Sequence, residues 1–210
     1  LLSIIAGLLE PEQGTILFNN PDGSLQYPKI GYMLQRDHLF EWRSVYRNVT
    51  LGLELHHMLT PERLENVDRL LEEYGLSAFR DKRPSELSGG MKQRAALIRT
   101  LALEPQLLLL DEPFSALDYQ TRLMVSADIC RLIRAAGKTM IIITHDLSEA
   151  ISVADRIIIL SGRPAVIKTE MPVKLTLTDD SPLAARNAPE FQLLFNRLWE
   201  DLTHENKSDS

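Results

Sequence analysis

The chain has 210 residues, of which 44% are hydrophobic and 25% charged, and this balance is typical of one folded domain. This composition excludes the collagen and disordered classes. A disulfide scaffold is also excluded, because the single cysteine, Cys130, cannot close an intramolecular disulfide; we interpret it as a buried thiol. The 29 acidic and 23 basic residues give a net charge of -6, which argues against a nucleic-acid binder that works through a broad basic surface. No apolar run approaches the roughly 18 residues that span a bilayer, so any membrane role is expected to need a separate partner subunit.

The first expected elements are a short helix and two strands. Residues 1–9 are largely apolar, with no initiator methionine, no charged signal-peptide segment and no helix cap, so we expect the sequence to begin inside a helix. A turn at 10–14 leads to a predicted strand at Thr15–Phe18. A second strand is predicted at Ile30–Leu34.

The pattern becomes helical from about residue 45 to residue 99. One helix is predicted over Val45–Met58, and a second between its N-cap Thr60 and the glycine that ends it, Gly75. A third begins at Ser88 and ends near Leu103. We expect residues 40–98 to form a helical subdomain inserted into the order of the sheet.

The rest of the chain alternates between apolar strands and helices, which predicts a doubly wound parallel sheet. Side strands are predicted at Thr15–Phe18 and at Ala165–Thr169, and residues 204–210 form a polar tail. The stripe Phe191, Leu194, Phe195, Leu198 and Leu202 has helical spacing and is expected to pack on its own domain, with contact to another subunit as the alternative. The predicted strands are Leu107–Leu110, Thr139–Ile143 and Ile157–Leu160, and the helices are Thr121–Ala136 and Leu147–Ala154.

Polar side chains follow three of the predicted strands. Gln35 follows the strand at Ile30–Leu34, Asp111 and Glu112 follow Leu107–Leu110, and His145 follows the strand that begins at Thr139. Ligands of open parallel sheets bind at the carboxyl ends of the strands, so these groups are expected to converge on one ligand.

The adjacent carboxylates Asp111 and Glu112 end a strand that is too apolar to lie at the surface. Burying their charge is costly unless it is paired or bound to a metal. One carboxylate can hold Mg²⁺ while its neighbour deprotonates a water for in-line attack on a phosphate. The alternative is that Asp111 caps the next turn and Glu112 is solvated.

Ser88, Gly89 and Gly90 open a predicted helix. Each glycine costs about 1 kcal/mol relative to alanine inside a helix, so capping explains the serine but not the glycine pair. Close approach of a ligand explains both glycines, because bare N–H groups and the positive end of the helix make an anion site.

Three segments together resemble the ABC ATPases. Leu87–Arg94 (LSGGMKQR) is similar to the signature sequence of that family, Asp111–Asp118 (DEPFSALD) to Walker B with the D-loop, and Thr144–Asp146 (THD) to the H-loop, while Gln35 corresponds to the Q-loop glutamine. The resemblance implies an α/β fold in which residues 1–210 form one ABC ATPase domain: a P-loop NTPase-like parallel sheet core, an inserted ABC helical subdomain and antiparallel side strands. It also implies ATP and Mg²⁺ as ligands, and a head-to-tail dimer with ATP between the subunits.

The resemblance also implies a role for each site residue. Glu112 would be the general base, and His145 would contact the terminal phosphate and hold the attacking water. Asp111 would bind Mg²⁺, and Gln35 would sense both the metal and the phosphate. The signature residues would contact the ATP of the opposite subunit, and the D-loop would bridge the interface; these nucleotide-binding positions are Ser88, Gly89, Gly90, Gln93, Ser115 and Asp118.

One departure from the family concerns the start of the sequence. Family members carry G-x-x-x-x-G-K-[ST] directly before the helix that here begins at residue 1. We therefore expect the sequence to be an N-terminally truncated part of a longer ATPase. The alternative is a natural paralogue without ATPase activity.

Weaker similarities indicate the kind of transporter. Residues 39–49, 161–164 and 189–191 are similar to those of importers for nitrate, sulfonates, taurine and bicarbonate. This implies a cytoplasmic ATPase, peripheral at the inner face of the membrane, that works as a homodimer or with a paired ATPase beneath a transmembrane permease. Trp42 would then lie where the permease docks, unless it is an anchor within its own domain.

Two other functions remain open from the sequence. A soluble ABC ATPase of DNA repair or translation should carry coiled-coil or zinc insertions, a second cassette or a basic groove, and the sequence shows none. A regulatory fragment without catalysis would bind permease or ATPase partners but would not hydrolyse ATP.

Overall fold

The computed structural model describes residues 1–19, 26–135, 137–162, 165–178 and 182–203. The predicted polar tail and the end of the 161–164 string lie outside these ranges. The chain divides into two compact units. The first contains Leu1–Tyr119 and Leu132–Ile143, and the second contains Gln120–Arg131 and the residues from Thr144 onward.

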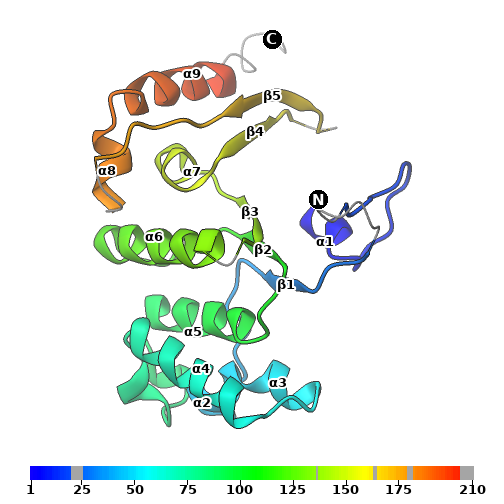
Figure 1. Ribbon diagram of the computed structural model, residues 1–210, viewed down its shortest axis with the longest axis vertical. Helices are drawn as coiled ribbons and strands as arrows, with labels where there is room; N and C mark the ends of the chain where they lie inside the picture. Colours follow the sequence, from blue (N-terminus) through cyan, green and yellow to red (C-terminus); the bar gives the residue numbers. More distant parts are fainter. Residues whose placement is uncertain (20–25, 136, 163–164, 179–181, 204–210) are drawn as a thin grey trace. The chain divides into compact units, whose positions relative to one another are not determined.

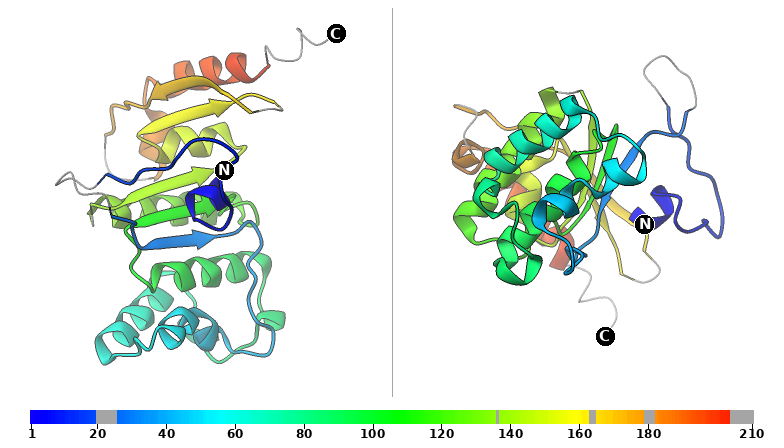
Figure 2. Two further views of the ribbon diagram at one scale, coloured as in Figure 1. Left: turned by 90° about the vertical axis from the view of Figure 1, so that its right-hand side faces the viewer. Right: turned by 90° about the horizontal axis from the view of Figure 1, so that it is seen from below.

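A three-stranded parallel sheet organises the first unit. Its order is β1 (Ile30–Met33), β2 (Leu107–Asp111) and β3 (Thr139–Ile143), and the strands lie side by side in Figure 2. The four leucines of β2 are buried, as expected for a central strand covered on both faces. Alternate residues of this strand point to opposite faces, and Leu107 and Leu109 pack with Leu2 of α1 (Leu2–Ile5). The parallel arrangement predicted for these three strands is confirmed.

The residues predicted to form a helical subdomain follow β1 in the same unit and form several helices (Figure 1). The helix predicted over Val45–Met58 is broken into two short helices at Thr50. The Thr50 hydroxyl donates to the Tyr46 carbonyl oxygen at 2.8 Å, a bond that competes with regular helix. The longer α5 packs against α2, α4 and β1. The helices are α2 (Val45–Val49), α3 (Leu51–Leu55), α4 (Pro61–Glu73), the 3₁₀ turns η1 (Ser77–Phe79) and η2 (Pro84–Glu86), and α5 (Gly89–Leu101).

The signals that predicted α4 are all present in the structure. The Thr60 hydroxyl accepts a hydrogen bond from the Arg63 N–H, and Gly75 follows the helix with a φ of 67°.

The strand predicted at Thr15–Phe18 is wrong, because this segment is irregular and only the next residue, Asn19, forms an isolated bridge. One apolar residue of this segment, Phe18, packs its ring against that of Tyr27, with the ring centroids 5.0 Å apart.

The second unit is built on an antiparallel pair, β4 (Arg156–Leu160) and β5 (Ile167–Pro172). The prediction that β4 belongs to the parallel sheet is wrong, since among the described residues it pairs with β5. The short connection between them explains why this pair is antiparallel, because a parallel pair needs a crossover of about a dozen residues or more. The unit's helices are α7 (Leu147–Val153), α8 (Pro182–Asn187) and α9 (Phe191–Thr203), while the residues of α6 (Tyr119–Ala135) divide between the two units.

The C-terminal helix shares a hydrophobic core with these strands. Leu198 is fully buried with Ile151, Ile159 and Met171, and the half-buried Phe191, Leu194 and Phe195 pack against this cluster. The stripe therefore packs on its own domain, as predicted, although Leu202 and the neighbouring Trp199 are exposed. In the part of the chain that the structure describes, every helix is too short or too polar to cross a membrane.

Candidate functional site

The predicted acidic pair lies where β2 ends. Asp111 is the last residue of the strand, and Glu112 follows with a φ of 45°, in the left-handed region that non-glycine residues rarely adopt. The Glu112 N–H donates to the Ile143 carbonyl oxygen at 2.9 Å, so the turn is attached to the end of β3. Both carboxylates are half-buried at the carboxyl edge of the sheet. Backbone strain of this kind collects at functional sites.

Gln35 reaches this pair from the neighbouring strand. It lies two residues after β1, and its Nε2 donates to Glu112 Oε2 at 2.9 Å. The structure thus brings together two of the polar groups predicted to converge. The segment after Gln35 is held by α5, because the Arg99 guanidinium donates to the carbonyl oxygens of Asp37 at 2.7 Å and His38 at 2.8 Å.

The glycine-rich start of α5 is capped as predicted. Ser88 is exposed, and its Oγ accepts a hydrogen bond from the Met91 N–H at 3.3 Å. Ligand approach was expected to explain both glycines, but Gly90 has another reason: a Cβ there would lie 3.1 Å from Leu117 Cδ2. Gly89 is exposed, and a Cβ would meet its nearest atom at 3.9 Å. A Cβ at Gly89 would make only ordinary van der Waals contact, so Gly89 is the less crowded of the pair.

Gln93 was predicted to contact the nucleotide, but its side chain is used inside the fold. The residue is only 5% exposed. Its Nε2 donates to the Glu112 carbonyl oxygen at 3.3 Å, and its Oε1 accepts from the Ala116 N–H at 3.0 Å. Gln93 therefore joins α5 to the turn that carries the acidic pair.

The D-loop positions follow the same turn. Ser115 is exposed, and its Oγ donates to the Glu112 carbonyl oxygen at 3.1 Å. Asp118 is exposed immediately before α6. Both residues can therefore meet another molecule, as their predicted place at a subunit interface requires.

His145 belongs to the second unit and is described with it. It is exposed, and the next residue, Asp146, caps α7 by accepting from the Ser148 N–H at 2.9 Å and the Glu149 N–H at 3.1 Å. Asp146 also forms an ion pair with Arg122 at 3.0 Å. The H-loop segment is thus fixed directly after His145.

Sequence reasoning missed Glu149 of α7, which is only 7% exposed. Burial raises its pKa to about 7, with a further contribution from the charge of Asp146. Arg122, a hydrogen bond with the Thr144 side chain, and His145 act in the opposite direction. The sequence did offer a signal for this burial. Glu149 lies four residues before Val153, and this spacing puts both residues on the same buried face of the helix.

This pKa predicts how stability depends on pH. Because the folded-state pKa lies above the ordinary value of 4.5, the folded state binds the proton more tightly, and stability falls as pH rises from about 4.5 to about 7. The loss is on the order of 3 kcal/mol. Glu149→Gln removes the charge, so we expect its thermal midpoint to exceed the parent's by several degrees at pH 8 and to match it near pH 4.5.

Calorimetric unfolding at both pH values measures this effect. The control is Glu200→Gln, which removes an exposed carboxylate from α9 and should leave the midpoint unchanged. A difference between Glu149→Gln and the parent that is the same at both pH values would contradict the assignment.

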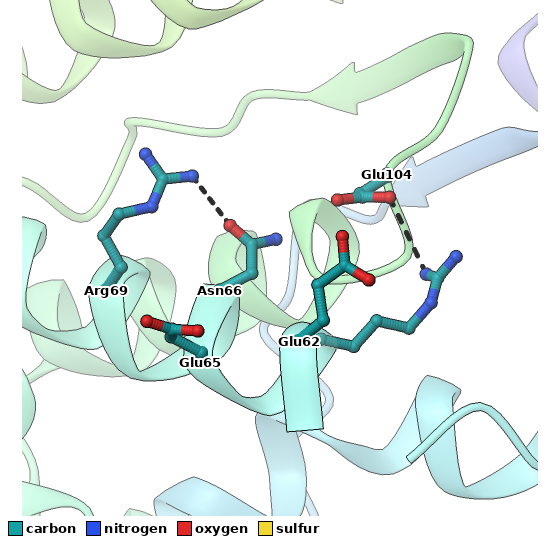
Figure 3. A pocket seen from close by; sticks show the side chains of 6 residues that line it. Glu62, Glu65, Asn66, Arg69 and Glu104 are labelled. Atoms are coloured by element: carbon teal, nitrogen blue, oxygen red, sulfur yellow. Dashed lines mark hydrogen bonds and ion pairs between the residues drawn. The ribbon is translucent and has the colours of Figure 1, made fainter. Parts of the chain in front are cut away.

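A shallow groove of about 350 Å³ lies elsewhere, along α4 (Figure 3). Its walls carry charges of both signs. Arg63 lies 3.8 Å from Glu104, and Arg69 donates to the amide oxygen of Asn66 at 2.7 Å. It contains none of the predicted site residues. The lining residues are Glu62, Arg63, Glu65, Asn66, Arg69 and Glu104.

The first unit therefore has the layout of an α/β protein that binds nucleotide phosphates: paired carboxylates at a buried strand end, a glutamine from the next strand and a glycine-rich helix start. The family model described as ABC transporter matches residues 1–115. The uncharacterised ABC transporter ATP-binding protein YtlC of Bacillus subtilis strain 168 is 46% identical over 202 residues, covering 96% of this chain and 78% of that protein.

Two further comparisons agree. The taurine import ATP-binding protein TauB of Roseobacter denitrificans is 36% identical, covering 95% of this chain and 77% of that protein. The ATP-binding cassette MJ0796, solved as a dimer in a post-hydrolysis state with ADP and Pi, has a TM-score of 0.71 and 28% identity, covering 82% of this chain and 79% of that one. The chain belongs to the ABC transporter ATP-binding family, and its enzyme class is that of an ATP hydrolase.

Proposed function

We propose that this chain is the ATP-hydrolysing subunit of a bacterial importer of the taurine, sulfonate or nitrate type. The observation that carries the catalytic part is the contact between Gln35 and the Glu112 carboxylate at the edge of the sheet. Similarity to TauB along nearly the whole chain supports the importer type. The solute itself is selected by the permease and an external binding protein.

In the proposed reaction the Glu112 carboxylate accepts a proton from a water molecule. The water oxygen forms a bond to the terminal phosphorus of ATP while the bond to the ADP oxygen breaks, so the products are phosphate and ADP. Gln35 holds the carboxylate through its Nε2, and we propose that His145 contacts the terminal phosphate. The strained turn keeps the Glu112 side chain at the strand end, where a nucleotide binds in this class of sheet.

Mg²⁺ fits the groups at this edge. Asp111 supplies carboxylate oxygens, and the amide oxygen of Gln35 is available because its Nε2 is the atom that faces Glu112. Mg²⁺ prefers oxygen ligands and is commonly held by one or two protein groups together with phosphates and water. When bound, the ion neutralises phosphate charge.

A second copy of the chain is the proposed partner of the signature helix. Ser88, Gly89, Ser115 and Asp118 are all exposed, and the contact between Gly90 and Leu117 places the start of α5 against the D-loop. These groups form one surface of the first unit, with bare N–H groups at a helix start. We propose that this surface binds the ATP held by the other subunit of a head-to-tail dimer.

The permease is proposed to dock around Trp42. This side chain is 73% exposed, which disfavours the alternative that it anchors its own domain. The centroids of the Trp42 and Phe40 rings lie 4.8 Å apart, and the neighbouring Arg43 forms an ion pair with Glu54 of α3. An exposed tryptophan on a supported loop is typical of a protein interface. The subunit would then lie at the cytoplasmic face of the membrane.

Reconstitution with the permease in lipid vesicles tests this proposal. Trp42→Asp should abolish ATP-driven uptake of taurine, alkylsulfonate or nitrate, and also the stimulation of hydrolysis by the permease, because a charge replaces the apolar contact. Hydrolysis by the isolated ATPase should stay near the parent's. Leu193→Asp on α9 is the control, since it places the same charge on another exposed apolar residue. Uptake that survives Trp42→Asp contradicts the docking site, and uptake of none of the three solutes contradicts the importer type.

A further inference from the structure

A single buried amide spans the turn that carries Glu112. The Gln93 Nε2 donates to the Glu112 carbonyl oxygen, and its Oε1 accepts from the Ala116 N–H, so its two ends hold the first and last residues of the turn. Only a primary amide presents a donor and an acceptor in this way, and asparagine is one methylene shorter. Methionine would fill a similar volume without either hydrogen bond.

The turn needs such support because its backbone is strained at Glu112. A non-glycine residue at positive φ persists when the surrounding structure determines its conformation. Here the Glu112 N–H is held by the Ile143 carbonyl, and the Glu112 carbonyl by Gln93 and by the Ser115 hydroxyl. Ser115 is exposed and belongs to the turn itself, whereas Gln93 is buried and comes from α5.

We infer that Gln93 is a positioning residue for ATP hydrolysis, which fixes the backbone of residues 112–116 so that the Glu112 carboxylate stays aligned with the attacking water. The inference rests on the proposed role of Glu112 as the base. It also connects two functions, because Gln93 lies on the helix that begins with Ser88 and Gly89. A Cβ at Gly90 would lie 3.1 Å from Leu117 Cδ2, so the start of α5 also lies close to this turn.

Steady-state hydrolysis of MgATP by Gln93→Met in the complete ATPase is the first test. Misplacing a catalytic group by about 1 Å can cost roughly a hundred-fold in rate, so we expect kcat to fall about ten- to a hundred-fold. The KM for MgATP and the Kd from calorimetric titration should stay near the parent's, because the Gln93 amide is buried and bonded within the fold. Thr100→Val is the matched control: Thr100 is a buried residue of α5 whose hydroxyl donates to the Ala96 carbonyl, and its loss should leave kcat unchanged.

A double substitution separates positioning from a general structural effect. In the Glu112→Gln background the base is already lost, so adding Gln93→Met should lower kcat no further. A further fall by the same factor as in the parent overturns the inference, and so does a kcat of Gln93→Met near the parent's. If Gln93→Met does not fold, Gln93→Asn replaces it, since the shorter amide cannot reach both groups. Near-normal turnover of Glu112→Gln alone would instead contradict the proposed base.

Discussion

In the complete ATPase, replacing Glu112 by glutamine should lower ATP turnover about 100- to 10,000-fold, because the amide keeps the shape of the side chain but cannot accept the proton of the attacking water. The local geometry should survive, since the amide oxygen can still accept the hydrogen bond that Gln35 donates to Glu112 Oε2. MgATP binding should therefore be retained. Phosphate release measures the turnover, calorimetric titration measures binding, and size-exclusion chromatography in ATP should show dimers accumulating.

The matched control is Glu65→Gln, which removes an exposed carboxylate of α4 in the same unit. Its turnover should equal the parent's. If Glu112→Gln hydrolyses ATP at nearly the parent's rate, Glu112 is not the base, and another group must accept the proton.

Ser88→Arg should abolish hydrolysis while each subunit keeps its own affinity for MgATP. Ser88 is exposed at the start of α5, where an arginine side chain would occupy the space proposed for the other subunit's phosphate. The substitution also removes the cap on the Met91 N–H, which costs about 1 kcal/mol of stability. Ser85→Arg controls for the added charge, because Ser85 is exposed three residues earlier and caps no α-helix.

Mixing the two inactive variants tests whether the site is shared between subunits. A heterodimer of Ser88→Arg and Glu112→Gln contains one composite site with an intact Glu112 and an intact Ser88, so hydrolysis should reappear in the mixture. Absence of recovery, or loss of MgATP binding by Ser88→Arg subunits alone, would show that the signature helix does not act across the dimer.

The sequence by itself determined the elements whose signals are local. The four leucines of β2 predict a buried strand without any knowledge of its neighbours, and Thr60 and Ser88 mark helix starts because each caps the N–H three residues on. The meeting of Gln35 with Glu112 followed from one rule, that carboxyl ends of parallel strands share an edge. The signature, Walker B and H-loop segments likewise predicted the family that the comparisons show.

Only the tertiary structure decided what lies opposite each residue. The polar Gln93 is buried because two backbone groups of the Glu112 turn meet its amide, and a side chain at Gly90 would press against Leu117. The burial of Glu149 near Asp146 likewise appears only in the folded chain. The apolar composition of β4 also does not reveal that this strand pairs with β5. The physical reason is common to these cases: propensity and capping act within a few residues, whereas burial and pairing depend on residues that are distant in the chain and adjacent only after folding.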